Sequence, residues 1–344
     1  MKQVAERAQV EGVAVVARPS CYLCGQPGTH LYKHLVDRLY SVPGSWNIRR
    51  CSDSRCGLLW LDPVPLDCSE FYDTYYTHQD AAKHSAEETT FSARLRWFVR
   101  FGAFRGSKTQ TAGKRAVRAC LGALTGFVFP PLLDQALTAK TGRLLDVGCG
   151  DGDLVLAAQE RGWQAEGVDS DSMAANFARR RGANVQAGSV AGQRYEGGTF
   201  DSIVMSHVIE HVSDPIDTLR ECYRILKPGG RLVLATPDIE SQFHQEFAQD
   251  WVHLDPPRHV HLFGPGTLSE VVRRAGFSKQ RAFTALGAPF VYQASEQIRR
   301  TGKYRERTSG VTMNVRAAAK LAAELMTIKF GRGLGEELRL IAEK

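Results

Sequence analysis

One stretch decides the fold that this sequence predicts: Arg143-Leu144-Leu145-Asp146-Val147-Gly148-Cys149-Gly150-Asp151-Gly152-Asp153-Leu154. It begins with a short apolar run, which is typical of a buried strand, and continues with glycines at alternate positions. Because glycine adopts positive φ and carries no Cβ, this spacing allows a sharp turn and a close approach of a ligand to the backbone. Residues 154–162 predict a helix whose unpaired N–H groups lie behind the turn.

A second predicted strand, residues 163–169, ends in an acidic residue. At this position the carboxylate of Asp169 can hold the two hydroxyl groups of a ribose. The order of strand, glycine loop, helix, strand and acidic end therefore predicts an α/β fold with a nucleotide-type ligand. The glycines do not have the G-x-G-x-x-G spacing of dinucleotide-binding proteins, and Asp146 stands just before the first of them.

These residues resemble the class I S-adenosylmethionine-dependent methyltransferases. The resemblance implies a Rossmann-like, mostly parallel sheet of seven strands with helices on both faces. Residues 199–206 match the family's fourth strand, and residues 231–237, after a helix-ending turn at 226–230, match its fifth strand. Residues 336–344, preceded by Gly335, are expected to form an antiparallel last strand. In the family the loop holds the amino-acid part of the cofactor, and the acid after the second strand holds the ribose. The cofactor-binding residues implied here are Asp146, Gly148, Cys149, Gly150, Gly152, Asp169, Ser170, Ser189, Val190, Met205, Ser206 and His207.

Two cysteine pairs near the N-terminus predict a metal site. Two residues separate Cys21 from Cys24, four separate Cys51 from Cys56, and each pair ends in Cys-Gly. Close spacing lets one turn present two thiolates, and the glycine allows the tight turn beneath them. Four thiolates leave no open coordination position, so we expect a structural Zn²⁺. The alternative is four buried thiols without a metal.

A tyrosine-rich segment follows at residues 70–78. The combination of a cysteine ribbon, an Asp-Pro-Val-Pro turn and this segment resembles one subgroup of class I methyltransferases, which acts in bacterial sugar, glycan and natural-product biosynthesis. The resemblance implies that the segment lies over the cofactor, with Tyr76 as a candidate catalytic residue and Tyr72 as a candidate substrate-binding residue. The alternative is that these tyrosines pack the ribbon onto the main domain.

Residues 89–133 contain no Asp or Glu but eight Lys and Arg, interleaved with Trp97, Phe98, Phe101 and Phe104. This pattern predicts a lid of amphipathic helices between the ribbon and the catalytic domain. The basic face is either solvated, bound to an anionic membrane or available to an anionic substrate. No recognisable nucleic-acid module accompanies the charge, so we expect no nucleic-acid partner.

The whole chain has 344 residues and a net charge of +7, which suits one large or two modest domains. We expect a lead-in (1–19), a zinc ribbon (20–68), a tyrosine-rich segment with the helical lid (69–138) and a catalytic domain (139–344). No apolar run reaches the length of a membrane span, and the N-terminus is unlike a signal peptide. We therefore expect a cytoplasmic protein, with peripheral contact to the inner face of the membrane as an alternative.

Methyl transfer to an alcohol or carbon acid needs an aligned nucleophile and a base, and histidine titrates in the suitable range. We predict His259 as the base, because it follows Arg258 on a proline-rich loop beyond the fifth strand. His261 is the second candidate, although it points the other way if the loop is extended. Arg258 is predicted to hold a phosphate or carboxylate of the substrate.

The run His207-Val208-Ile209-Glu210-His211 follows the fourth strand. Some related catechol O-methyltransferases carry two Glu and one His here as ligands of a divalent metal. Because His207 replaces the first Glu, we expect no metal and mutual hydrogen bonds between Glu210 and His211.

The sequence thus predicts methyl transfer from S-adenosylmethionine to O or C of a small-molecule acceptor, namely a sugar, glycan or natural-product intermediate. A lipid-linked or quinone-like acceptor at the membrane surface is the first alternative. A non-catalytic assembly protein that binds the cofactor is the alternative from another class.

Overall fold

The computed structural model describes residues 7–10, 12–66, 71, 132–137, 141–286, 289–305, 315–329 and 335–344. Of the predicted tyrosine-rich segment and basic lid (69–138), only residues 71 and 132–137 lie within these ranges, so that Tyr72 and Tyr76 lie outside them. The division into four segments that we infer from the sequence therefore stays a prediction.

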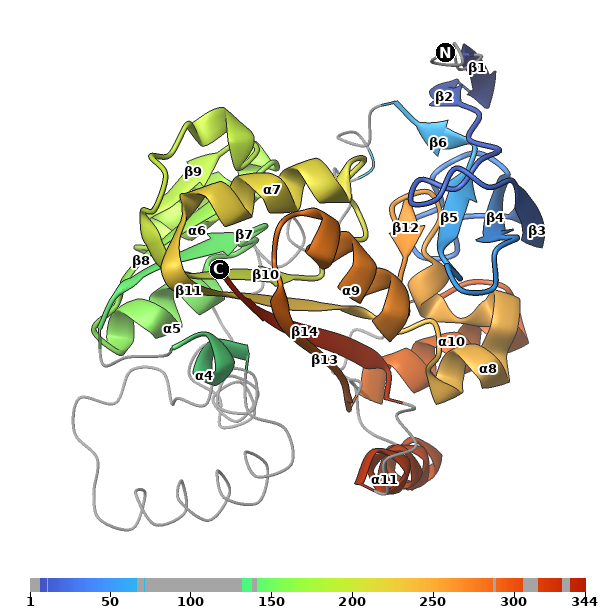
Figure 1. Ribbon diagram of the computed structural model, residues 1–344. Helices are drawn as coiled ribbons and strands as arrows, with labels where there is room; N and C mark the ends of the chain where they lie inside the picture. The colour runs from blue at the N-terminus through green and yellow to red at the C-terminus, as the bar shows by residue number, and fades with distance from the viewer. Residues whose placement is uncertain are drawn as a thin grey trace.

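A seven-stranded sheet forms the centre of the molecule, with the strand order β13-β14-β11-β10-β7-β8-β9 (Figure 1). The strands β7 to β11 are parallel to one another, whereas β14 is antiparallel to both β11 and β13. The predicted fold class and the antiparallel last strand are confirmed. The strands are β7 (Arg143–Val147), β8 (Gln164–Asp169), β9 (Val185–Ala187), β10 (Phe200–Ser206), β11 (Leu226–Pro237), β13 (Lys279–Ala285) and β14 (Glu337–Glu343).

Helices cover both faces of this sheet because its central strands are apolar on both sides. Leu145 and Ile203 share one buried cluster with α7 (Pro215–Ile225) and α9 (Pro265–Arg274). Leu144 and Val204, the adjacent residues in each strand, share another. The helices that pack into this second cluster are α4 (Leu132–Ala136), α5 (Asp153–Glu160) and α6 (Ser172–Arg180).

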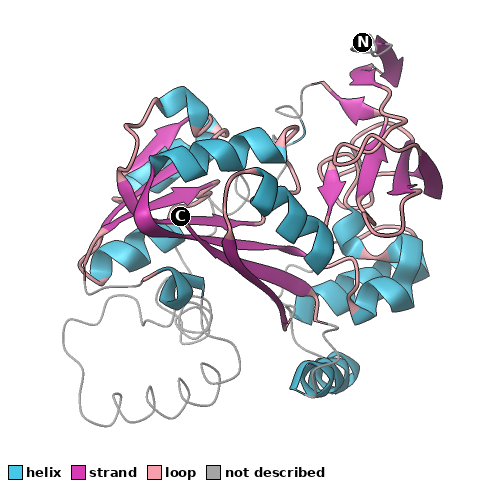
Figure 2. Ribbon diagram, in the orientation of Figure 1, coloured by secondary structure: helices cyan, strands magenta, loops and turns pink. Residues whose placement is uncertain are grey.

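The N-terminal part forms two small sheets, to the right of the central sheet in Figure 2. One contains β1 (Arg7–Val10), β2 (Val13–Val16) and β6 (Val64–Pro65). The other has the order β12-β5-β4-β3. Its fourth member comes from far along the chain, because β12 pairs antiparallel with β5. The strands of this ribbon sheet are β3 (Gly28–Leu35), β4 (Trp46–Cys51), β5 (Leu59–Asp62) and β12 (His261–Leu262).

The segment after β11 joins the ribbon sheet to the main sheet. It contains α8 (Gln242–Phe247) and the short helices η3 (Ala248–Asp250) and η4 (Val252–Leu254). Trp46 and Ile48 of β4 share a buried cluster with Trp251 and with residues of α10 (Pro289–Thr301). The ribbon therefore packs on the catalytic part through a continuous apolar core. The remaining described helix is α11 (Val315–Lys329), and none of the described helices is long and apolar enough to cross a membrane.

Candidate active site

The glycine loop between β7 and α5 has the conformation that its sequence requires. Gly148, Gly150 and Gly152 have φ angles of 70°, 53° and 79°. A Cβ at Gly148 would lie 2.2 Å from Cγ2 of Val208, so any larger residue there would collide with the segment that follows β10. The turn is closed by the N–H of Gly148, which donates to the carbonyl oxygen of Val168 at 2.7 Å.

Asp169, at the end of β8, ties the second strand to this loop. One carboxylate oxygen accepts the N–H of Gly150 at 2.7 Å, and the other accepts the N–H of Asp171 at 2.9 Å. Burial raises the pKa of Asp169. The loop and this carboxylate lie at the carboxyl ends of adjacent parallel strands, where α/β sheets bind nucleotide-type ligands. These residues fit the adenosine and amino-acid parts of S-adenosylmethionine.

The other predicted cofactor residues lie around the same edge of the sheet. Ser170 and Ser189 are exposed there. Met205 and Ser206 end β10, beside β7. The predicted residues that are buried are Asp146, Cys149, Val190 and Met205.

A cluster of histidines and carboxylates lies beyond the ends of β10 and β11. His207 has a φ of 55° and presents its ring to two acids: Nδ1 lies 3.3 Å from Oε1 of Glu210, and Nε2 lies 3.3 Å from Oε2 of Glu337. Burial opposes protonation, but these two acids together raise the pKa of His207 to about 10. His207 is therefore a cation at neutral pH, which excludes it as a base.

Glu210 is fully buried behind His207. Its Oε2 accepts the hydroxyl of Thr236 at 3.0 Å, whereas Oε1 lies near His207 without hydrogen-bonding geometry. Burial alone would raise the pKa of Glu210, but the contact with His207 outweighs it and lowers that pKa to about 2. Thr236 thus contacts Glu210, and the carbonyl oxygen of Arg258 contacts His211; the mutual hydrogen bonds that the sequence suggested for Glu210 and His211 stay a prediction.

His211 and His259 face each other, with ring centroids 4.7 Å apart at an interplanar angle of 71°. Nδ1 of His211 bonds to the carbonyl oxygen of Arg258 at 3.0 Å, and Nδ1 of His259 bonds to that of His253 at 2.7 Å. A carbonyl oxygen only accepts, so both rings carry a proton on Nδ1, and in the neutral form of each ring the lone pair is on Nε2. One ligand atom each of Glu210, His211 and His259 lies within 4.8 Å of the others. This donor set fits a divalent cation, because imidazoles with Nδ1–H bonded to a carbonyl are typical metal ligands.

Sequence reasoning missed two members of the cluster. His253 stacks between the rings of His207 and His259, at centroid distances of 6.2 and 6.3 Å. The proline-rich loop that drew attention to His259 also contains His253, so this residue was within reach of the sequence. Glu337 lies 130 residues after His207, and no local pattern connects the two.

Arg258 and His261 do not face the cluster. The guanidinium of Arg258 is fully buried between Asp37 and Asp255, which argues against the predicted contact with substrate. His261 is also fully buried, with Nδ1 bonded to the carbonyl oxygen of Val212 and its ring 5.2 Å from that of Tyr22. The side chain of His261 thus points away from that of His259, as side chains two residues apart were expected to do on this loop.

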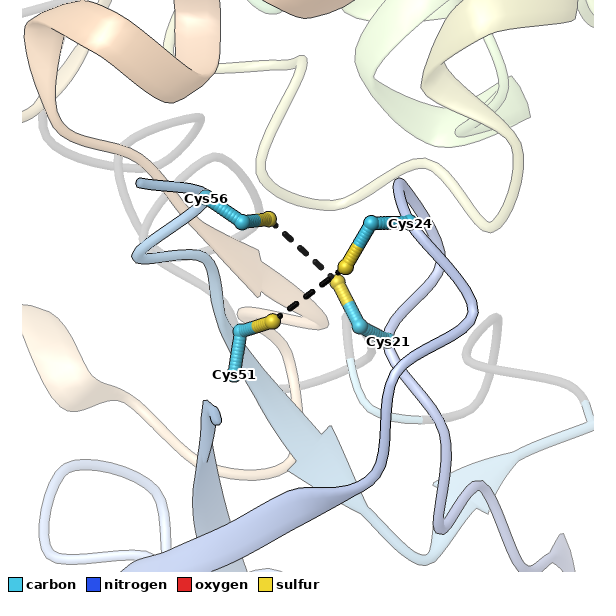
Figure 3. Close-up of side chains that lie close together, drawn as sticks. All are labelled: Cys21, Cys24, Cys51 and Cys56. Carbon is cyan, nitrogen blue, oxygen red and sulfur yellow. Dashed lines mark hydrogen bonds between the residues drawn. The ribbon is translucent and has the colours of Figure 1, made fainter. Parts of the chain in front are cut away.

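The four N-terminal cysteines converge on one point (Figure 3). Sγ of Cys21 lies 3.6 Å from that of Cys56, and Sγ of Cys24 lies 3.3 Å from that of Cys51. Zn–S bonds of about 2.3 Å in a tetrahedron separate the sulfurs by about 3.8 Å. The cysteines, brought together from the turn before β3 and the turn after β4, therefore fit a single tetrahedral ion.

The fold, the glycine loop and Asp169 together define a domain that binds a nucleotide-type cofactor at the carboxyl ends of β7 and β8. Residues 123–281 match the family model described as "Methyltransferase domain". Over these residues the chain is similar to methyltransferase domains, in agreement with its resemblance to the class I S-adenosylmethionine-dependent family.

The similar proteins include an uncharacterised 37.1 kDa protein in a transposon of Streptomyces fradiae, 33% identical over 45% of this chain and 46% of that protein. A ubiquinone biosynthesis O-methyltransferase of Pseudomonas paraeruginosa is 35% identical over 29% of this chain and 45% of its own. The chain spans about half the length of the curated relatives that it matches. A solved S-adenosylmethionine-dependent methyltransferase from Mesorhizobium loti is 19% identical, with 63% of this chain and 98% of that one covered and a TM-score of 0.45. A likeness this distant carries no argument about function.

Proposed function

We propose that this protein transfers the methyl group of S-adenosylmethionine to a hydroxyl oxygen of a small-molecule acceptor. The observation that carries the proposal is the cluster of Glu210, His211 and His259 at the same edge of the sheet as the glycine loop. A relative named as an O-methyltransferase supports oxygen as the acceptor atom. The same name favours a quinone-like or phenolic acceptor over the sugar or glycan that the sequence suggested.

In this proposal the loop residues and Asp169 hold S-adenosylmethionine, which supplies a methyl group on a positively charged sulfur. The acceptor hydroxyl approaches in line with the C–S bond, so that the new O–C bond forms as the C–S bond breaks. Nε2 of His259 receives the hydroxyl proton, because Nδ1 is already protonated and bonded to the carbonyl of His253. His211 keeps this ring in place from its edge.

A specific observation favours a second form of the same chemistry. Oε1 of Glu210 is buried and has no hydrogen-bond partner among the described residues. Burial and the neighbouring His259 lower the pKa of His211 to about 4, so its ring is neutral at pH 7, the form that binds metals. Glu210, His211 and His259 would then hold a divalent cation that lowers the pKa of the acceptor hydroxyl.

The test uses labelled S-adenosylmethionine and a lysate as the source of acceptors, partitioned between water and organic solvent. We expect label in the organic phase with the wild-type protein, and loss of transfer of at least about 100-fold in His259→Ala. Affinity for the cofactor should change less than about 2-fold. His30→Ala, at an exposed position of β3, is the matched control.

The outcomes separate the alternatives. Loss of transfer in EDTA and its recovery with Mg²⁺ or Mn²⁺ would favour the metal-bound form. Label in the water phase would favour a sugar-type acceptor. Unchanged transfer by His259→Ala would refute its role, and cofactor binding without any transfer would favour the non-catalytic alternative.

We also propose that Cys21, Cys24, Cys51 and Cys56 hold a structural Zn²⁺. The convergence of four sulfurs, without a fifth ligand among the residues that the structure describes, supports a closed site rather than a catalytic one.

A further inference from the structure

A buried ion pair connects the ribbon sheet to the loop that carries His259. Asp37 follows β3, and Arg258 directly precedes His259. Nη1 of Arg258 donates to Oδ2 of Asp37 at 2.8 Å, and Nη2 donates to Oδ1 at 2.9 Å. Both side chains have no exposed surface. Two parallel charge-assisted bonds of this kind fix the plane of the guanidinium as well as its distance.

The carboxylate of Asp37 is held in place by its own loop. It accepts the backbone N–H groups of Leu39, Tyr40 and Val42 at 2.9, 3.0 and 3.0 Å. Although burial alone would raise it, these bonds and Arg258 lower the pKa of Asp37. Asp37 is therefore an anion in a fixed position on the ribbon.

The other contacts of Arg258 are also buried. Its Nε donates to Oδ2 of Asp255 at 3.0 Å, and its guanidinium carbon lies 4.6 Å from the centre of the Tyr40 ring. Asp255 therefore contacts the edge of the guanidinium, and the Tyr40 ring contacts its face. The side chain thus serves as an anchor for the loop.

The backbone of the same residue meets the histidine cluster. The carbonyl oxygen of Arg258 accepts a hydrogen bond from Nδ1 of His211 at 3.0 Å. Next along the chain, the N–H of Val260 donates to the carbonyl oxygen of Glu210 at 2.9 Å, while the carbonyl of Val260 accepts the N–H of Leu61 in β5 at 3.0 Å. The backbone of residues 258–260 is therefore held on one side by the ribbon and on the other by the segment that follows β10 in the main sheet.

We infer that Asp37 is a positioning residue, through which the ribbon sets the orientation of the His211 and His259 rings by way of Arg258. The inference rests on the proposed function, because those rings are the groups that we propose to act on the acceptor. A buried ion pair adds little net stability compared with apolar side chains of the same size, whereas its directed bonds define one geometry. A shift of the Arg258 carbonyl would move the acceptor of His211 and the backbone of His259 together.

The test compares Asp37→Asn with the wild-type full-length chain. The amide cannot accept both guanidinium bonds and the three backbone bonds. We expect the ring resonances of His211 and His259 to shift in spectra of histidine-labelled protein, and amide hydrogen exchange over residues 251–262 to rise at least about 10-fold. Cofactor affinity should stay within about 2-fold of wild type, because Asp37 contacts no residue of the glycine loop among its described contacts.

Asp201→Asn is the matched control. It removes a carboxylate that pairs with Lys227 and accepts the N–H of Arg143, where β7 and β10 begin, at the opposite end of the sheet from the cluster. This variant should leave both loop readouts unchanged. If Asp37→Asn does not fold, Arg258→Lys gives the same test, because lysine keeps the charge without the two-pronged geometry.

Unchanged histidine resonances and unchanged exchange in a folded Asp37→Asn protein would overturn the inference. So would equal changes in the Asp201→Asn control. Both readouts are independent of the acceptor, so a wild-type protein that transfers no methyl group would refute the proposed function and leave this test intact. Where an acceptor is found, Asp37→Asn should lower kcat about 10- to 100-fold without raising KM for the cofactor.

Discussion

The role of Asp169 in holding the cofactor loop can be tested by changing one atom, in Asp169→Asn. In the folded protein the two carboxylate oxygens accept two backbone N–H groups, those of Gly150 and Asp171. An asparagine amide has one oxygen and one NH₂ group, so one N–H donor would face another donor. The glycine loop or the turn into α6 must then move away.

A hydrogen bond to a charged acceptor contributes about 1.5–3 kcal/mol. Loss of one such bond from the arrangement that binds the ribose should weaken cofactor binding by roughly 10- to 150-fold. The assay is calorimetric titration with S-adenosylhomocysteine, which has the same adenosine and no methyl group to transfer. The melting temperature, measured in parallel, shows whether the variant is folded.

Glu166→Gln is the matched control. Glu166 lies three residues earlier in β8, and its side chain bonds to Arg143 at 3.0 Å, away from the glycine loop. The control should bind like the wild type. A folded Asp169→Asn protein with affinity within about 2-fold of wild type would refute the role that we assign to this carboxylate.

Two further predictions concern stability. Cys21→Ser should lose bound zinc in metal analysis and lower the unfolding temperature of the N-terminal part, whereas Cys222→Ala should keep its zinc; a wild-type protein that is stable without metal would contradict the structural role. Burial raises the pKa of Glu336 to about 8, above the ordinary 4.5 of an unfolded chain, so the wild type should lose stability as the pH rises from 4.5 to 8. The Glu336→Gln side chain cannot ionise, so this variant should lose less stability over that range, by up to about 1.4 kcal/mol per pH unit. The free energy of unfolding is measured by urea titration at pH 5 and pH 8. An equal change with pH in the variant and the wild type would exclude this cause.

Local patterns in the sequence were sufficient for the cofactor loop and the two strands beside it, whereas the full sheet was implied by the family resemblance. The apolar run before Gly148, the alternate glycines and the acid at the end of the next strand each act over a few residues, and their structure follows from backbone geometry. The same holds for the two cysteine turns. Their convergence could be predicted because four thiols at this spacing are typical of one shared tetrahedral site.

The histidine cluster could be predicted only in part, because its geometry depends on contacts between distant segments. Nothing near Arg258 in the sequence indicates that Asp37, 221 residues earlier, takes both of its Nη groups. An arginine beside a candidate base was therefore assigned to the substrate. Glu337 was missed for the same reason: its side chain meets His207 only because β14 inserts between β13 and β11.

The ribbon sheet supports the loop that carries His259. Cys51 ends β4, β4 pairs with β5, and β5 pairs with β12, which begins two residues after His259. Without the ribbon, the loop from Trp251 to Val260 would lose its strand partner and the acceptor of the Arg258 guanidinium together. What would remain is a buried cation that keeps Asp255 but has lost its two bonds to Asp37, and a two-residue strand without an edge to pair with. The cofactor loop has no such dependence, because its hydrogen bonds to Val168, Asp169 and Arg181 all lie outside the ribbon. Cofactor binding and the arrangement of the proposed catalytic histidines should therefore be separable by mutation: changes in the ribbon should affect the second and spare the first.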